Sequence, residues 1–167
     1  AEIRVRLEIY DDFTKKQTQT PELAGACVLE TPPLLGVRPT RFIEGEYKIT
    51  AEDAISGKRF DDVVAISSAP IIHFYGYRRY LEHEGYDIPY RCLVPKKVEN
   101  LLVAGRCISS EQQPYESHRS MVPIMAIGQA AGVAAAISCK TGQNPRHANI
   151  GQIQETLVAQ GAVVKRP

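Results

Sequence analysis

The chain has 167 residues, of which 44% are hydrophobic and 23% are charged, so its composition is globular and excludes a disordered chain. Twenty Lys and Arg residues against nineteen Asp and Glu residues leave a net charge of +1, and the basic residues are scattered. This charge balance gives no electrostatic reason to expect a nucleic acid or a membrane as a partner.

The four cysteines, Cys27, Cys92, Cys107 and Cys139, form no C-x-x-C pair and have no accompanying pattern of zinc ligands. Their even number leaves disulfides open, but nothing in their spacing pairs any two of them. We therefore expect reduced thiols, no metal site and a cytoplasmic protein. The chain begins with "AEIRVRLEIY", which is not a signal peptide, and this start without Met leads us to expect a piece of a longer protein.

The first part of the chain predicts mainly strands and loops. Residues 3–10 alternate apolar and polar side chains, which predicts a strand with one wet face, and residues 61–68 predict a buried strand. Thr50, Asp53 and Gly57 have the spacing of an N-cap, a capping-box partner and a C-terminal stop around a short helix. Residues 75–95 hold five of the eight tyrosines and predict an irregular ordered loop.

The pattern changes near Pro95. An apolar strand is expected over 99–104, then a polar connection, a helix over 122–138 and a final amphipathic helix that points Ile153, Leu157 and Val158 inward and stops at Gly161. The sequence thus divides into a β-rich segment, 1–95, and a strand–loop–helix segment, 96–167. The fold class expected is α/β, as a mixture of α and β elements.

The helix expected over 122–138 is rich in small residues. Gly128, Gly132 and Ala136 lie four residues apart, and each mid-helix glycine costs about 1 kcal/mol relative to alanine. Such glycines allow a backbone or a flat ligand to approach closely, although tight helix packing alone also explains them. Both glycines lying in solvent with nothing against them would contradict a close contact. The stretch is long enough to span a membrane, but its Ala and Gly content favours a buried helix of a soluble protein.

The first turn of this helix, residues 121–125, has unpaired N–H groups and the positive end of the helix dipole, which suits an anion or a polarised carbonyl oxygen. Pro123 is compatible with an early helical position because it has no N–H to lose. The preceding "NLLVAGRCIS", residues 100–109, ends its apolar run at Gly105, where a bulky ligand can touch the backbone.

Several ordered blocks of the chain together resemble a known family. "YDIPYRCLVPKKVENLLVAGRCIS" followed by "SHRSMVPIMAIGQAAGVAAAI" is similar to the C-terminal end of FAD-dependent oxidoreductases of the glutathione-reductase-like flavoprotein superfamily. "LGVRPTRFIEGEYKITAEDAISGKRFDDVVA", residues 35–65, resembles the segment that precedes this end. The similarity covers roughly residues 35–164.

The resemblance implies a two-domain flavoprotein in which residues 1–95 belong to a β-rich substrate or cap domain. Residues 96–167 would supply the final strand and helix of a Rossmann-like FAD-binding domain. The pyrophosphate-binding GxGxxG unit of such a domain is absent from this sequence. The implied partner is therefore a chain or segment that carries this unit, together with a small-molecule substrate.

The resemblance also assigns residues to the cofactor. Ala104, Gly105 and Arg106 would lie against the ribityl and pyrophosphate region of FAD, and backbone N–H groups near Val122, Ile124 and Met125 would face the pyrimidine edge of the flavin. We expect FAD to be bound non-covalently, although Cys107 and His118 are chemically able to form a flavin bond.

The catalytic candidates that the resemblance implies are His73, Arg119 and Tyr90. Each has a structural alternative: a hydrogen-bonding role for His73, a salt bridge for Arg119, and ordering of the loop for Tyr90 and its neighbour Arg91. The paired Arg38 and Arg41 match arginines of the family. Two guanidinium groups three residues apart would suit the binding of a carboxylate or phosphate, and structural ion pairs are the alternative.

The sequence departs from the family at residues 111–114, where "EQQP" replaces a "T-H-E-A" block. If the histidine of that block is catalytic in relatives, its chemistry here is absent or passes to His118 or Tyr115. Two functions remain open: a part that completes the flavin site and contributes to hydride transfer, and a non-catalytic subunit that stabilises a flavin-bearing partner.

Overall fold

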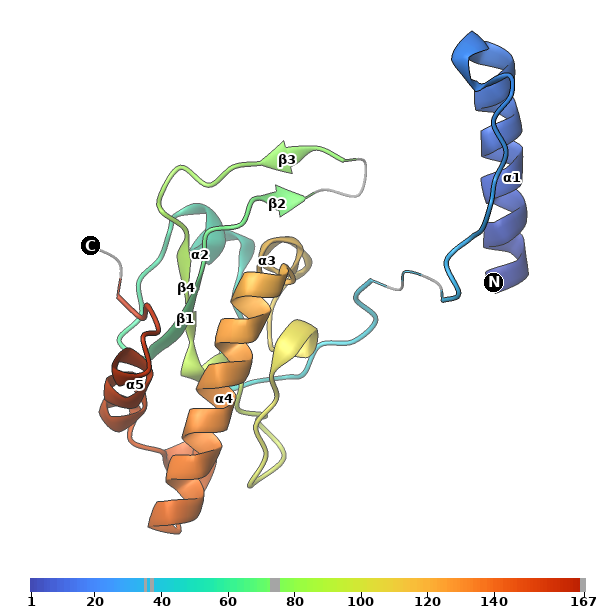
Figure 1. Cartoon of the computed structure of the whole chain (residues 1–167). Helices are drawn as coiled ribbons and strands as arrows, with labels where there is room; N and C mark the ends of the chain where they lie inside the picture. The colour runs from blue at the N-terminus through green and yellow to red at the C-terminus, as the bar shows by residue number, and fades with distance from the viewer. Residues whose placement is uncertain (35, 37, 73–75, 166–167) are drawn as a thin grey trace. The chain divides into compact units, whose positions relative to one another are not determined.

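The computed structural model describes residues 1–34, 36, 38–72 and 76–165. Helices and short antiparallel strands are both present, so the mixed α/β class is confirmed (Figure 1). The chain divides into two compact units, 1–38 and 39–167. The division near Pro95 into a β-rich segment, 1–95, and a strand–loop–helix segment, 96–167, stays a prediction.

The unit 1–38 contains α1 (Glu2–Gln19) and a 3-10 turn, η1 (Pro21–Leu23). The strand expected over 3–10 is therefore wrong. Ion pairs four residues apart, Arg4–Glu8, Glu2–Arg6 and Asp12–Lys16, stabilise a helix. The alternating apolar residues lie on opposite sides of this helix and all of them are exposed, so their period-two spacing does not reflect a buried face.

The returning segment after η1 is hydrogen-bonded to α1. The Gln17 amide donates to the carbonyls of Leu23, Ala24 and Ala26, and the Arg6 guanidinium donates to Thr31 and to the Pro33 carbonyl. None of the described residues of this unit is buried, so these residues form no hydrophobic core.

The unit 39–167 is built around a two-stranded antiparallel pair. β1 (Val63–Ser67) pairs with β4 (Tyr86–Pro89), with Ala65 opposite Ile88 and Ser67 opposite Tyr86. The strand expected over 61–68 is confirmed, whereas β4 lies inside the stretch expected to be an irregular loop. A second pair joins β2 (Ile71–Ile72) to β3 (Arg78–Arg79).

The remaining elements of this unit are mostly helical. The capping box expected around α2 (Ala51–Ile55) is present, because Thr50 Oγ1 accepts from the Asp53 N–H and the Asp53 carboxylate accepts from the Thr50 N–H. Gly57 follows with a φ of 64°, a left-handed conformation that suits a helix stop. The other elements are η2 (Tyr90–Cys92), η3 (Gly105–Cys107), α3 (Gln112–His118), α4 (Met121–Thr141), η4 (Pro145–His147) and α5 (Ile150–Ala159).

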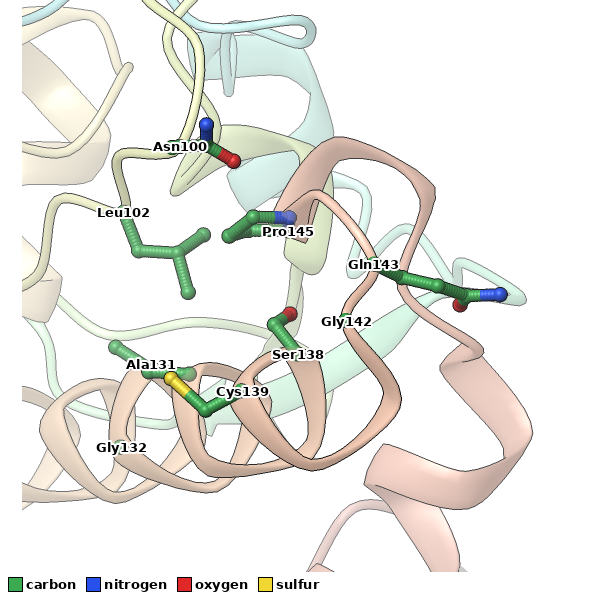
Figure 2. A pocket seen from close by; sticks show the side chains of 10 residues that line it. Asn100, Leu102, Ala131, Gly132, Ser138, Cys139, Gly142, Gln143 and Pro145 are labelled. Atoms are coloured by element: carbon green, nitrogen blue, oxygen red, sulfur yellow. The ribbon is translucent and has the colours of Figure 1, made fainter.

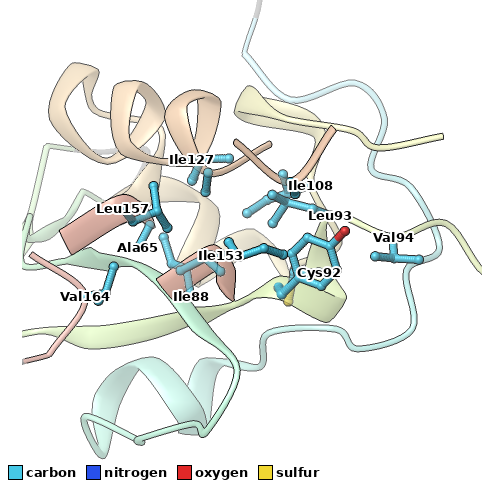
Figure 3. Packing of buried hydrophobic residues seen from close by; sticks show 14 of the residues in the cluster. Ala65, Ile88, Cys92, Leu93, Val94, Ile108, Ile127, Ile153, Leu157 and Val164 are labelled. Carbon is cyan, nitrogen blue, oxygen red and sulfur yellow. The ribbon is translucent and has the colours of Figure 1, made fainter. Parts of the chain in front are cut away.

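Helices α4 and α5 pack on β1, and the core lies between them (Figure 3). Ile127 and Ala134 of α4 and Ile153 and Leu157 of α5 are buried there. The amphipathic α5 and its stop at Gly161, with a φ of 83°, are confirmed, but Val158 is exposed rather than inward.

The strand expected over 99–104 is wrong, because no strand of the described chain forms a ladder with it. The segment is held instead by the bond from the Val103 N–H to the Leu93 carbonyl at 2.8 Å and, at its start, by the Glu99 carboxylate, which accepts from Asn144 and Arg146. The close contact expected at Gly128 and Gly132 is not made by any described residue of this chain, so that expectation is wrong within the chain. Both glycines are exposed, and nothing lies within 4 Å of a Cβ built on either.

Candidate functional site

The structure brings the Gly105 turn next to α4, since η3 packs against this helix. Gly105 has a φ of 89°, a left-handed conformation that is unfavourable for other residues. Nothing lies within 4 Å of a Cβ built at this position, so the backbone is open on that side. Ala104 is extended, Arg106 is exposed, and the Cys107 thiol lies 3.7 Å from the Ala104 carbonyl oxygen.

The first turn of α4 is open as well. Its N-cap, Ser120, makes no side-chain capping bond, and the N–H groups of Met121 and Val122 have no acceptor among the described residues. The Ile124 N–H donates to the Ser120 carbonyl at 3.2 Å and is not free. The side chains of Met121, Val122 and Met125 are 82%, 77% and 72% exposed. The helix therefore presents free N–H groups, its positive end and an apolar surface together.

Arg119 lies immediately before this turn, at the C-terminal end of α3. Its Nε donates to the Glu116 carboxylate at 2.7 Å, and the other oxygen of that carboxylate accepts from the Gln112 amide at 2.9 Å. Glu116 is buried, which fixes the direction of the guanidinium group. The ion pair is the structural alternative considered for Arg119, and it leaves the terminal nitrogens of the guanidinium without a hydrogen bond to the described residues.

Helix α3 is anchored by a buried polar network that sequence reasoning missed. Ser67 Oγ lies 2.9 Å from Ser117 Oγ, which donates to the Ala69 carbonyl at 2.5 Å, and the Tyr86 hydroxyl donates to the Pro114 carbonyl at 3.0 Å. His118 Nε2 lies 3.1 Å from Ser110 Oγ. These partners lie 8 to 50 residues apart in the chain, and no spacing in the sequence indicates them.

Tyr90 is a core residue in the structure. Its ring is 2% exposed, its hydroxyl donates to the Pro145 carbonyl at 2.8 Å, and burial raises its pKa to about 12. The neighbouring Arg91 forms a two-point ion pair with Asp62, at 2.9 and 3.1 Å. Both placements agree with the alternative in which this pair of residues orders the loop.

The other sequence candidates are less informative. His73 lies outside the described residues. Arg38 and Arg41 are exposed and fall on either side of the division between the two units. Tyr115 is buried, with its ring edge-on to those of Phe42 and His118. No group of three potential metal ligands occurs in the described part of the chain, and the four cysteines are free.

A cleft of about 640 Å³ lies along the C-terminal half of α4 (Figure 2). Ala131, Gly132 and Ala135 form the helix wall, Asn100 and Leu102 lie opposite, and Ser138 and Cys139 lie toward the end of the helix. Among the described helices, α4 alone is long and apolar enough to span a membrane. Its buried side nevertheless packs on the core of this unit, as expected for a helix of a folded domain.

The residues at Gly105 and the start of α4 fit a flavin cofactor. An open left-handed glycine allows contact with the backbone, and uncapped N–H groups suit the polar pyrimidine edge. The polar network through α3 holds the helix start in position beside the Gly105 turn.

Comparison with known proteins gives the family of the chain. The family model described as FAD dependent oxidoreductase matches residues 1–157, so the similarity begins upstream of the segment noted from the sequence. No curated protein and no solved structure matches the chain. The chain belongs to the FAD dependent oxidoreductase family, and its cofactor is FAD.

Proposed function

We propose that this chain is the C-terminal part, or a small subunit, of an FAD-dependent oxidoreductase of the glutathione-reductase-like superfamily. In this proposal the segment from Ala104 to Arg106 and the start of α4 complete the flavin end of a site. The adenine and pyrophosphate end belongs to a partner chain or segment with a GxGxxG unit, since this sequence contains none. The protein would be cytoplasmic, in keeping with its four free thiols.

One observation carries the proposal: the open Gly105 backbone lies beside a long helix whose first N–H groups are uncapped. FAD, when bound, supplies the hydride acceptor for oxidation of the substrate. The chain's own contribution would be positional and electrostatic. The N–H groups of Met121 and Val122 favour negative charge at the neighbouring flavin edge, and the apolar side chains around them exclude water.

The substrate side of the site would involve Arg119, with His73 and Tyr90 as the other candidates. The Glu116 carboxylate holds Arg119 by one nitrogen, so its remaining nitrogens can bind the flavin or an anionic group of the substrate. The buried Tyr90 hydroxyl is already bonded to Pro145, which makes it the weakest of the three candidates.

A second function is favoured by the same contacts: a non-catalytic subunit that stabilises a flavin-bearing partner. The bonds of Arg119, Tyr90 and Arg91 within the chain are all typical of structural residues.

The test is to purify the chain with its natural partner and record the visible spectrum. We expect flavin absorbance in the complex and release of the flavin on denaturation, as for non-covalent binding. A complex without flavin would overturn the proposal. In the flavin-containing complex, Arg119→Ala and His73→Ala distinguish the two functions: a large loss of turnover with retained flavin supports the catalytic part, and unchanged turnover supports the structural subunit.

A further inference from the structure

A second cleft, of about 400 Å³, is lined mainly by two neighbouring segments, 42–48 and 109–110. Their main chains hold them together, because the Ile49 N–H donates to the Ser109 carbonyl at 3.1 Å. A Cβ built at Gly45 would lie 2.7 Å from the Ser109 Cβ, so this close contact requires a glycine. The walls of the cleft are therefore fixed by the fold.

The Ser109 hydroxyl is a buried polar group that lines this cleft. Ser109 is 1% exposed, and its Oγ makes no hydrogen bond to the described residues. His118 Nδ1 and Ser138 Oγ also lack a partner among these residues, but both of those atoms are sealed from solvent, whereas Ser109 Oγ is not. A buried hydroxyl without a partner costs free energy. Ser109 Oγ is therefore placed to bond a ligand that enters the cleft.

Ammonium groups give this cleft an excess of positive charge. Lys48 lines it and forms no ion pair with the described residues. Lys96 lines it too, and the Glu44 carboxylate lies 3.8 Å from Lys96 and 3.7 Å from Lys97. Both distances are too long for hydrogen bonds, so the ammonium groups keep their donors available. Three ammonium groups against one carboxylate attract an anion.

The other lining groups favour an organic acid over a bare inorganic anion. Phe42 and Ile43 are half-buried and supply apolar surface. Gly45 and Ser110 also line the cleft, and their main-chain N–H groups have no acceptor among the described residues. The two oxygen atoms of a carboxylate can accept from ammonium, hydroxyl and N–H donors together, while the rest of the ligand contacts the apolar side chains.

We propose that this cleft binds the carboxylate of a small organic acid. The Ser109 hydroxyl and the ammonium groups of Lys48 and Lys96 hold the carboxylate, and the apolar part of the acid lies against Phe42 and Ile43. The site shares no residue with the proposed flavin site, and it adds a class of ligand that the proposed function leaves open.

The test is a calorimetric titration of the intact flavin-containing protein with benzoate. Benzamide is the matched neutral ligand, because it has the same shape without the charge. At low ionic strength we expect benzoate to bind with a Kd on the order of 1 mM. Benzamide should bind at least about tenfold more weakly, because it lacks the charge that the ammonium groups attract.

Substitutions in the cleft locate the bound benzoate. Ser109→Ala and Lys48→Gln should each weaken its binding at least about tenfold, because each removes a bond to the carboxylate, and Lys48→Arg should preserve binding. Glu44→Gln should strengthen binding about threefold, because Glu44 repels the ligand and competes for Lys96. The control is Lys97→Gln, which loses the same charge outside the cleft lining and should change the Kd by less than about twofold.

Three results would overturn the inference. Equal affinity for benzoate and benzamide would show that the charge is not recognised. Benzoate binding that Ser109→Ala and Lys48→Gln leave unchanged would place the ligand elsewhere. Inorganic phosphate that binds as tightly as benzoate would indicate a site for any anion rather than for organic acids. Absence of flavin absorbance would overturn the proposed function alone, because the benzoate titration is read independently of the flavin.

Discussion

The His118 imidazole and the Ser110 hydroxyl are hydrogen-bonded, with 3.1 Å between Nε2 and Oγ, and both side chains are buried. Ser110 Oγ itself donates to the Glu111 carbonyl at 3.1 Å, so the proton of this pair belongs on Nε2. Nδ1 is then a buried acceptor that has no partner among the described residues. The pair joins the end of α3 to the segment that follows Gly105, and so connects the two parts of the candidate flavin site.

This pair makes the stability of the fold depend on pH. Burial lowers the pKa of His118 from 6.5 to about 4, so the unfolded chain binds more protons than the folded chain between these values. The free energy of unfolding should therefore fall as the pH decreases from about 6.5 to about 4, by up to about 3 kcal/mol. Urea unfolding of the flavin-containing protein at several pH values measures this. His118→Gln should flatten the dependence, whereas His147→Gln, at an exposed histidine, should not.

Tyr90→Phe separates the structural from the catalytic role of this residue. Loss of the hydrogen bond to the Pro145 carbonyl should lower the free energy of unfolding by about 1 kcal/mol. Turnover at saturating substrate should change by less than about threefold, because the hydroxyl is occupied within the core. A loss of turnover of 100-fold or more in a folded variant would contradict the structural role.

Gly105→Ala and Gly128→Ala are expected to have opposite effects. Alanine at Gly105 has to adopt a φ of 89° and should destabilise the turn by about 1 to 2 kcal/mol, with weaker retention of FAD. Gly128 lies mid-helix with open space around its Cα, so alanine should stabilise α4 by about 1 kcal/mol. Thermal unfolding and flavin retention of the two variants check this. A destabilised Gly128→Ala variant would indicate that another molecule covers this part of the helix.

Asp53→Ala should be the most destabilising of these substitutions, at about 2 to 4 kcal/mol. The Asp53 carboxylate accepts from the Thr50 N–H, from the Tyr47 hydroxyl at 2.7 Å and from the Lys58 ammonium group at 2.7 Å. Thr50→Ala removes only one side of the capping box and should cost about 1 kcal/mol. Equal losses in the two variants, measured by urea unfolding, would contradict a shared role of Asp53 in the cap and the ion pair.

Local signals in the sequence determined several elements correctly. Thr50, Asp53 and Gly57 specify α2 because a capping box and a left-handed stop act within one or two turns. The apolar spacing of α4 and α5 and the buried run of β1 were recognisable for the same reason. The ordered motifs from residue 35 onward were enough to indicate the family, and hence FAD.

Tertiary structure decided what depends on distant partners. Residues 3–10 have a strand-like alternation, but ion pairs four residues apart and hydrogen bonds to the returning segment favour α1. Residues 101–104 have the composition of a strand, yet a strand exists only where a neighbour pairs with it, and the part of the chain that the structure describes supplies none. The polar network under α3 and the buried Ser138 hydroxyl likewise depend on which distant groups meet, and this is settled by packing rather than by spacing along the chain.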